Sequence, residues 1–307
     1  MKRPKTSPSR ADIEPISKPE EEQLDFDSLI GCLVQVIESM KGTGSVGGEW
    51  LLDAEGLTHK FFSHCSTFKY LWTGVPLPIE IPELSNNLDD VFSLSVIARA
   101  AFENMLVFQY LFVSRNDLDT REARYWAWQL SDLLMRKRIM IEWMVFKSSD
   151  HEKTAITDRQ AIAGLENKLR NNNVFLSLST NIQRDILERP GRWRIPIKPA
   201  DGPPSWADIA TEAGFGSHYS RVLYPLLCSY AHSASLSVLQ LRQGTLETRN
   251  RKAAILLRLM NVAIAMMIRG WQTINPLAES AYSLNPRLKG AVSKWLDFAK
   301  AETNLHL

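Results

Sequence analysis

The chain has 307 residues, of which 45% are hydrophobic and 23% are charged. This is the composition of an ordinary globular protein, and it excludes a disordered chain, a collagen-like repeat and a small disulfide-stapled domain. The 36 lysines and arginines stand against 34 aspartates and glutamates, a net charge of +2. The overall charge therefore demands neither nucleic acid nor a membrane surface as a partner.

The first 22 residues contain four prolines and almost no large apolar side chain. Such a stretch buries too little surface to offset the entropy of ordering it, so we predict a disordered tail over residues 1–22. No apolar segment follows the basic residues at the N-terminus, and we expect no signal peptide.

From residue 25 onward, apolar side chains recur at spacings of three and four, the period of an amphipathic helix. The pattern predicts helices over residues 25–41, 49–72, 87–114, 119–147, 150–189, 205–213, 218–241, 246–273 and 286–302. The helical region over 150–189 is expected to break near residues 171–173. Because no strand pattern of more than a few residues occurs, the sequence predicts an all-α fold, a single large multi-helix bundle over residues 23–307.

Two stretches are apolar enough to suggest membrane spans. Residues 91–113 carry Arg99 and Glu103 in their middle, and each charge costs roughly 2.5–3.5 kcal/mol at a bilayer centre. Residues 253–268 are shorter than the ~20 residues that a span needs. We expect both stretches to be buried helices, and we expect no membrane partner.

The three cysteines, Cys32, Cys65 and Cys228, lie far apart and form no Cys-x-x-Cys motif. Free cysteines in apolar helices are typical of a reducing compartment, so we expect a cytoplasmic protein. The histidines show no metal-ligand spacing, and we expect neither a metal nor another cofactor.

One loop combines basic and aromatic residues. Arg192, Trp193 and Arg194 are candidates for binding a nucleic-acid backbone and stacking a base. The alternative is a solvated surface loop with no ligand.

The helix over 87–114 contains a second candidate site. Arg99 and Glu103 are four residues apart and share one face, while the surrounding residues are almost all apolar. A charge in a buried helix must be paired, so we expect a mutual ion pair or other bonded partners. Later in the chain, Ser229 and His232 share a helix face, and Glu103 or Ser229 would satisfy His232. This constellation is either a ligand or catalytic site, or a structural network between two central helices.

These short motifs, together with Tyr219 between them, resemble a bacterial all-helical family classed as a domain of unknown function. The residues that carry the resemblance are the run Ala98-Arg99-Ala100-Ala101-Phe102-Glu103, then Tyr219, then Ser229-Tyr230-Ala231-His232-Ser233. The likeness covers roughly residues 45–275. It implies an α-helical fold, and it makes Tyr219 and Ser229 expected binding residues.

A looser resemblance is to HEPN domains, helical bundles of toxins and phage-defence systems that are often metal-independent ribonucleases. Their mark is an arginine followed four to six residues later by a histidine, and none of the six histidines here has an arginine at that offset. Arg99 and His232 would instead have to converge from two helices.

Two functional hypotheses remain. The first is a bacterial defence or toxin-type effector that acts on RNA or a nucleotide, in which Arg99 binds phosphate, His232 is the general acid or base, and Glu103 orients one of them. The second is a non-catalytic interaction or scaffold module in which the Arg99–Glu103–His232 network is structural. Its partner would be another protein or a second copy of the chain.

Overall fold

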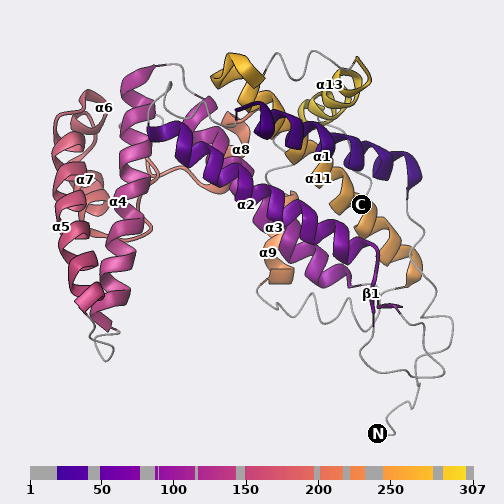
Figure 1. Ribbon diagram of the computed structural model, residues 1–307, viewed down its shortest axis with the longest axis horizontal. Coiled ribbons are helices and arrows are strands. Elements are labelled where there is room, and N and C mark those ends of the chain that lie inside the picture. Colours follow the sequence, from indigo (N-terminus) through magenta and orange to yellow (C-terminus); the bar gives the residue numbers. More distant parts are fainter. Residues whose placement is uncertain are drawn as a thin grey trace, which may run out of the picture. The chain divides into compact units, whose positions relative to one another are not determined.

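The computed structural model describes residues 19–40, 49–76, 87–88, 90–114, 117–142, 149–196, 201–216, 222–231, 245–278 and 286–301. The chain is all-α and multi-helical, as the sequence predicts (Figure 1). Its contacts divide it into two compact units, Met1–Phe108 with Gly214–Leu307 (unit 1) and Gln109–Ala213 (unit 2). The bounds proposed for the tail and for one continuous bundle stay predictions.

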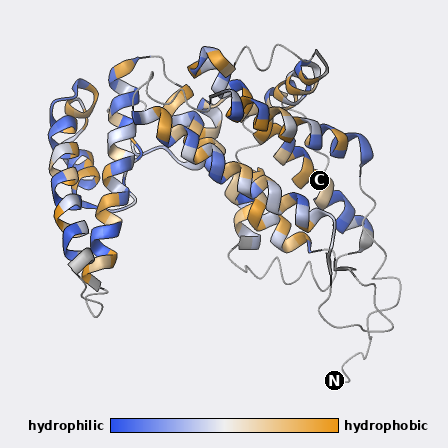
Figure 2. Ribbon diagram, in the orientation of Figure 1, coloured by the Kyte–Doolittle hydropathy of each residue, from blue (hydrophilic) through white to orange (hydrophobic). Residues whose placement is uncertain are grey.

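Unit 1 contains six helices and one short strand pair within the described residues. They are α1 (Glu20–Met40), α2 (Glu49–Trp72), β1 (Val75–Pro76), β2 (Asn87–Leu88), α3 (Val91–Phe108), α9 (Tyr224–Ala231), α11 (Leu246–Ile274) and α13 (Pro286–Lys300). Helix α11 packs against α1, α3 and α13, and α3 also packs against α2 and α9. Every side chain from Leu259 to Ile268 is buried, which makes α11 the central helix of this unit. Its apolar middle is visible in Figure 2.

A buried hydrogen bond connects α11 to α2. The indole Nε1 of Trp271 donates to the hydroxyl of Thr58 at 2.8 Å, and that hydroxyl donates in turn to the carbonyl of Ala54. Phe108 of α3 packs on the same indole, with ring centroids 5.5 Å apart. The Trp271 side chain of α11 therefore contacts both α2 and α3.

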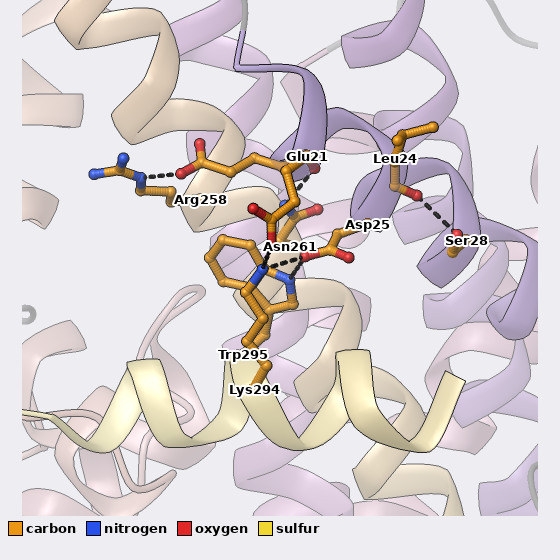
Figure 3. Close-up of polar contacts among 9 residues, drawn as sticks. Glu21, Leu24, Asp25, Ser28, Arg258, Asn261, Lys294 and Trp295 are labelled. Atoms are coloured by element: carbon orange, nitrogen blue, oxygen red, sulfur yellow. Dashed lines mark hydrogen bonds and ion pairs between the residues drawn. The ribbon is translucent and has the colours of Figure 1, made fainter. Parts of the chain in front are cut away.

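Helix α1 begins with acidic residues that bind basic residues of α11 and α13 (Figure 3). Glu22 accepts from Arg258 Nε at 2.8 Å, and its carbonyl accepts from the side-chain amide of Asn261 at 2.9 Å. Asp25 accepts from Lys294 at 2.9 Å and from the Trp295 indole at 3.0 Å. Helix α1 begins at Glu20, and the three glutamates of its first turn, Glu20–Glu22, favour the positive end of a helix.

Two helical segments are long and apolar enough to cross a membrane. They are Val91–Val113, which is α3 with the π-helical turn that follows it, and Glu247–Ile274 of α11. In their most apolar windows, 56% and 72% of the residues are buried inside the structure. Core helices pass the same test, so the finding is weak evidence for a span.

Unit 2 begins with a π-helical turn, Gln109–Val113, which continues directly from α3. Its helices are α4 (Leu118–Glu142), α5 (Ser149–Arg170), α6 (Asn173–Leu176), α7 (Thr180–Glu188) and α8 (Trp206–Glu212). The break predicted near residues 171–173 is confirmed. Asn172 there caps α6 by accepting from the Phe175 amide at 3.0 Å.

The core of unit 2 lies where α4 packs against α5, α6 and α7. Its buried residues are Ala123, Ala127, Leu130, Ile162, Leu165, Leu169, Phe175, Leu178, Ile186, Leu187 and Ile195.

A charged side chain is buried beside this core. The side chain of Arg124 is 1% exposed and binds both carboxylate oxygens of Glu212, at 2.9 and 3.1 Å. Its other terminal nitrogen donates to the carbonyl of Tyr110 at 3.0 Å, and its guanidinium lies 3.8 Å from the centre of the Tyr110 ring. The Tyr110 hydroxyl donates to the carbonyl of Ile195 and accepts from the amide of the same residue. This Arg124 network joins four segments of unit 2.

We expect Arg124→Ala to lower the free energy of unfolding by about 3–5 kcal/mol, because it leaves the nearly buried Glu212 carboxylate without its cation. Arg189→Ala is the matched control, since the Arg189–Asp185 pair lies at the surface and such pairs contribute about 1 kcal/mol or less. Urea unfolding monitored by circular dichroism measures the free energy of unfolding of both variants. Equal small losses for the two variants would contradict the role assigned to Arg124.

Candidate functional site

The ion pair predicted within α3 is confirmed. Arg99 Nε donates to Glu103 Oε1 at 2.9 Å, one helical turn away. The two side chains are 17% and 27% exposed, so the pair is half-buried and water reaches its edge. Asp90 caps this helix by accepting from the Ser93 amide at 2.9 Å, which sets where α3 starts.

Helix α9 contributes two further side chains. The Tyr224 hydroxyl donates to the same Glu103 oxygen at 2.8 Å, and the Arg99 guanidinium lies 5.7 Å from the centre of the Tyr224 ring. Cys228 lies one turn further along α9, close enough to Tyr224 to contribute to raising its pKa. We call Arg99, Glu103, Tyr224 and Cys228 the Arg99 cluster. It connects α3 to α9 across 121 residues of sequence.

The pKa values of Tyr224 and Arg99 in this cluster are raised above their ordinary values. Burial raises the pKa of Tyr224 well above its ordinary value, and the hydrogen bond and negative charge of Glu103 raise it further. Burial lowers the pKa of Arg99, but its hydrogen bond and charge interaction with Glu103 outweigh burial and raise the pKa overall. At neutral pH, Arg99 is therefore a cation and Tyr224 a neutral hydrogen-bond donor.

The structure brings none of the other residues predicted for this site to Arg99 and Glu103 within the part of the chain that it describes. His232 and Tyr219 fall outside the described residues. Ser229 lies on α9, but its hydroxyl donates at 2.7 Å to the carbonyl of Leu226 in its own helix. The structure thus brings Glu103 to Tyr224, which the sequence analysis did not select.

The predicted basic loop belongs to unit 2, whereas the Arg99 cluster belongs to unit 1. Trp193 is half-buried against the core of unit 2, edge-on to the Tyr110 ring at 5.6 Å. The Arg194 guanidinium lies 5.3 Å from the centre of the Trp206 ring. Arg192 is exposed. The aromatic ring of Trp193, a candidate for stacking on a base, therefore packs against the core of unit 2.

Within the described part of the chain, no three histidine, cysteine, aspartate or glutamate side chains lie close enough together to hold a metal ion. Comparison of the chain with family models, curated proteins and solved structures gives no match.

The hydrogen bond between Tyr224 and Glu103 is testable by a double-mutant cycle. We expect Tyr224→Phe and Glu103→Gln to show a coupling energy of about 1 kcal/mol, because the bond has a charged acceptor but is only half-buried. Tyr70→Phe, at an exposed tyrosine of α2, serves as the control and is expected to leave stability unchanged. Additive effects of the two substitutions would show that the bond does not form in solution.

The three cysteines are expected to differ in reactivity. Burial raises the pKa of Cys32 to about 11 and raises that of Cys65 still further, so both stay protonated thiols. Cys228 is half-buried. We expect Ellman's reagent to modify one thiol in the native protein and three in denaturant, and Cys228→Ser to abolish the native reaction. Rapid modification of a second thiol would refute the burial of Cys32 and Cys65.

Proposed function

We propose that the chain is a non-catalytic helical interaction module, in which the Arg99 cluster fixes the register of α3 against α9. One observation carries this proposal: a single oxygen of Glu103 accepts from both Arg99 and Tyr224. The carboxylate that would orient a reacting group is thus already bound by two donors from two helices.

The same contacts argue against a phosphate-binding role for Arg99. An arginine that recognises phosphate presents an uncompensated charge and N–H groups to the ligand. Here Glu103 compensates the charge of Arg99 and occupies its Nε. Breaking the pair to admit a phosphate would leave Glu103 half-buried beside a second anion, which is unfavourable.

The buried charges of unit 2 are likewise used internally, since Arg124 is bound by Glu212 and by Tyr110. Apolar side chains at the surface point to contact with another molecule instead. Three of them, Met135, Ile139 and Ile141, fall within seven residues of α4. A contact surface on helices is what an interaction module requires.

We retain the RNA or nucleotide effector as a second proposal, on one specific observation. The Arg99–Glu103 pair is accessible to water, as a phosphate-binding site must be. In that proposal Arg99 binds phosphate, Glu103 orients a catalytic group, and His232 transfers a proton. Both proposals place the protein in the cytoplasm, in keeping with its three unpaired cysteines.

The two proposals are separated by a cleavage assay on tRNA, other RNA, single-stranded DNA and nucleoside triphosphates. For an interaction module, we expect no turnover by the wild type, by Arg99→Lys or by His232→Ala. We also expect Arg99→Lys to lower the melting temperature, because lysine cannot reproduce the Nε contact with Glu103.

The opposite result would establish the effector. It consists of cleavage by the wild type that both substitutions abolish while the melting temperature stays unchanged. Cys228→Ser is the matched control, since it alters the cluster without removing a charged group, and it should retain any such activity.

A further inference from the structure

The last turns of α4 expose large apolar side chains. We call residues Met135–Ile141 the α4 tip. Met135, Ile139 and Ile141 are 41%, 46% and 58% exposed, and Arg136, Lys137 and Arg138 between them are exposed as well. Figure 2 shows this end of α4 as one of mixed apolar and polar character.

Packing within unit 2 covers one side of the α4 tip. Arg136 binds Asp158 of α5, whose carboxylate is almost fully buried, and this pair fixes the side of the helix that faces α5. Successive residues of a helix are rotated by about 100°, so Ile139 and Ile141 lie about 200° apart around its axis. Apolar side chains are therefore exposed on opposite sides of the same two turns.

This arrangement favours one class of partner. A protein groove covers one face of a helix, and that face would carry apolar residues at spacings of three and four. A nucleic-acid backbone would contact the basic residues but leave the isoleucines in water. The apolar interior of a bilayer buries exposed apolar side chains without regard to direction, so it accommodates Ile139 and Ile141 on two different uncovered sides of the α4 tip.

The charges complement an anionic lipid surface. Asp158 compensates the charge of Arg136, whereas the next two residues, Lys137 and Arg138, add two exposed basic side chains within the apolar turns. Exposed lysine and arginine beside apolar side chains are characteristic of segments at a lipid interface. The exposed apolar residues of the α4 tip lie within seven residues of sequence, Met135 to Ile141, far fewer than the ~20 residues of a membrane span.

We propose that the α4 tip binds the surface of an anionic phospholipid bilayer. The expectation of no membrane partner came from the total charge of +2 and from the two rejected spans, residues 91–113 and 253–268. Neither criterion detects a short basic and apolar surface such as the α4 tip. The proposal rests on the interaction-module function, because both use the exposed apolar side chains of α4, and it identifies the partner of that surface as lipid.

The full-length chain is tested by co-sedimentation with vesicles of phosphatidylcholine alone and with about 30% phosphatidylglycerol. We expect binding to the anionic vesicles, at least about fivefold weaker binding to the neutral ones, and a marked loss of binding in about 0.5 M salt. Ile139→Asp combined with Ile141→Asp should reduce binding more than about tenfold, because charged side chains replace the inserted ones. Lys137→Glu should reduce it about fivefold or more.

Two variants in the same unit control for folding and charge. Leu176 on α6 is 55% exposed, and Arg170 at the end of α5 is also exposed, so Leu176→Asp and Arg170→Glu repeat the chemical changes elsewhere. Both should bind anionic vesicles as the wild type does. All variants are compared by circular dichroism to establish that they fold.

Three results would overturn the proposal. They are no sedimentation with anionic vesicles, equal losses for the tip variants and their controls, or self-association in gel filtration that the isoleucine substitutions abolish without any vesicle binding. The last result would assign the α4 tip to a second copy of the chain. None of these readouts depends on nucleic-acid cleavage, so they leave the proposed function to its own test.

Discussion

An arginine never gives up its charge inside a protein, so burying one obliges the surrounding fold to supply a carboxylate and acceptors in fixed positions. Arg124 imposes this requirement on unit 2. Its guanidinium binds Glu212, which lies 88 residues further along the chain, and the carbonyl of Tyr110. The Tyr110 hydroxyl then holds the segment at Ile195 through two hydrogen bonds. Helix α4, the π-helical turn, the loop before α8 and α8 itself are thereby positioned by one cation.

The Arg99 cluster uses related chemistry at a shallower depth. An arginine, a glutamate and a tyrosine again connect segments remote in sequence, but water reaches the pair at its edge. Solvent weakens each interaction, so the energetic contribution is smaller while the geometric constraint on α3 and α9 is similar. The half-exposed position is also why this cluster, and not the Arg124 network, carries the alternative of a reactive site.

The helices of this chain were predictable because apolar periodicity reports which residues of a segment face inward. The same reasoning identified Arg99 and Glu103, since two charges four residues apart stand out in the apolar helix α3. It missed Arg124 because α4 is rich in charged residues, and local pattern does not tell a buried arginine from a solvated one. Tyr224 and Glu212 escaped notice for another reason: their partners lie 121 and 88 residues away, and periodicity assigns a face but not the helix opposite it. The packing of Trp193 was unpredictable for the same reason, because the ring that it contacts, Tyr110, lies far away in sequence.

The π-helical turn at Gln109–Val113 makes the spacing of the chain matter as much as its residue types. A π turn holds one residue more than an α turn, and the Ser114 amide accordingly reaches back five residues to the carbonyl of Gln109. Loss of a single residue in this turn would restore a regular α-helix and rotate the side chains within the turn by about 100° about the helix axis. The Tyr110 carbonyl and ring would then point away from Arg124, although neither residue had been replaced. Related chains that keep the Arg124 network are thus expected to tolerate substitutions in this turn more readily than insertions or deletions.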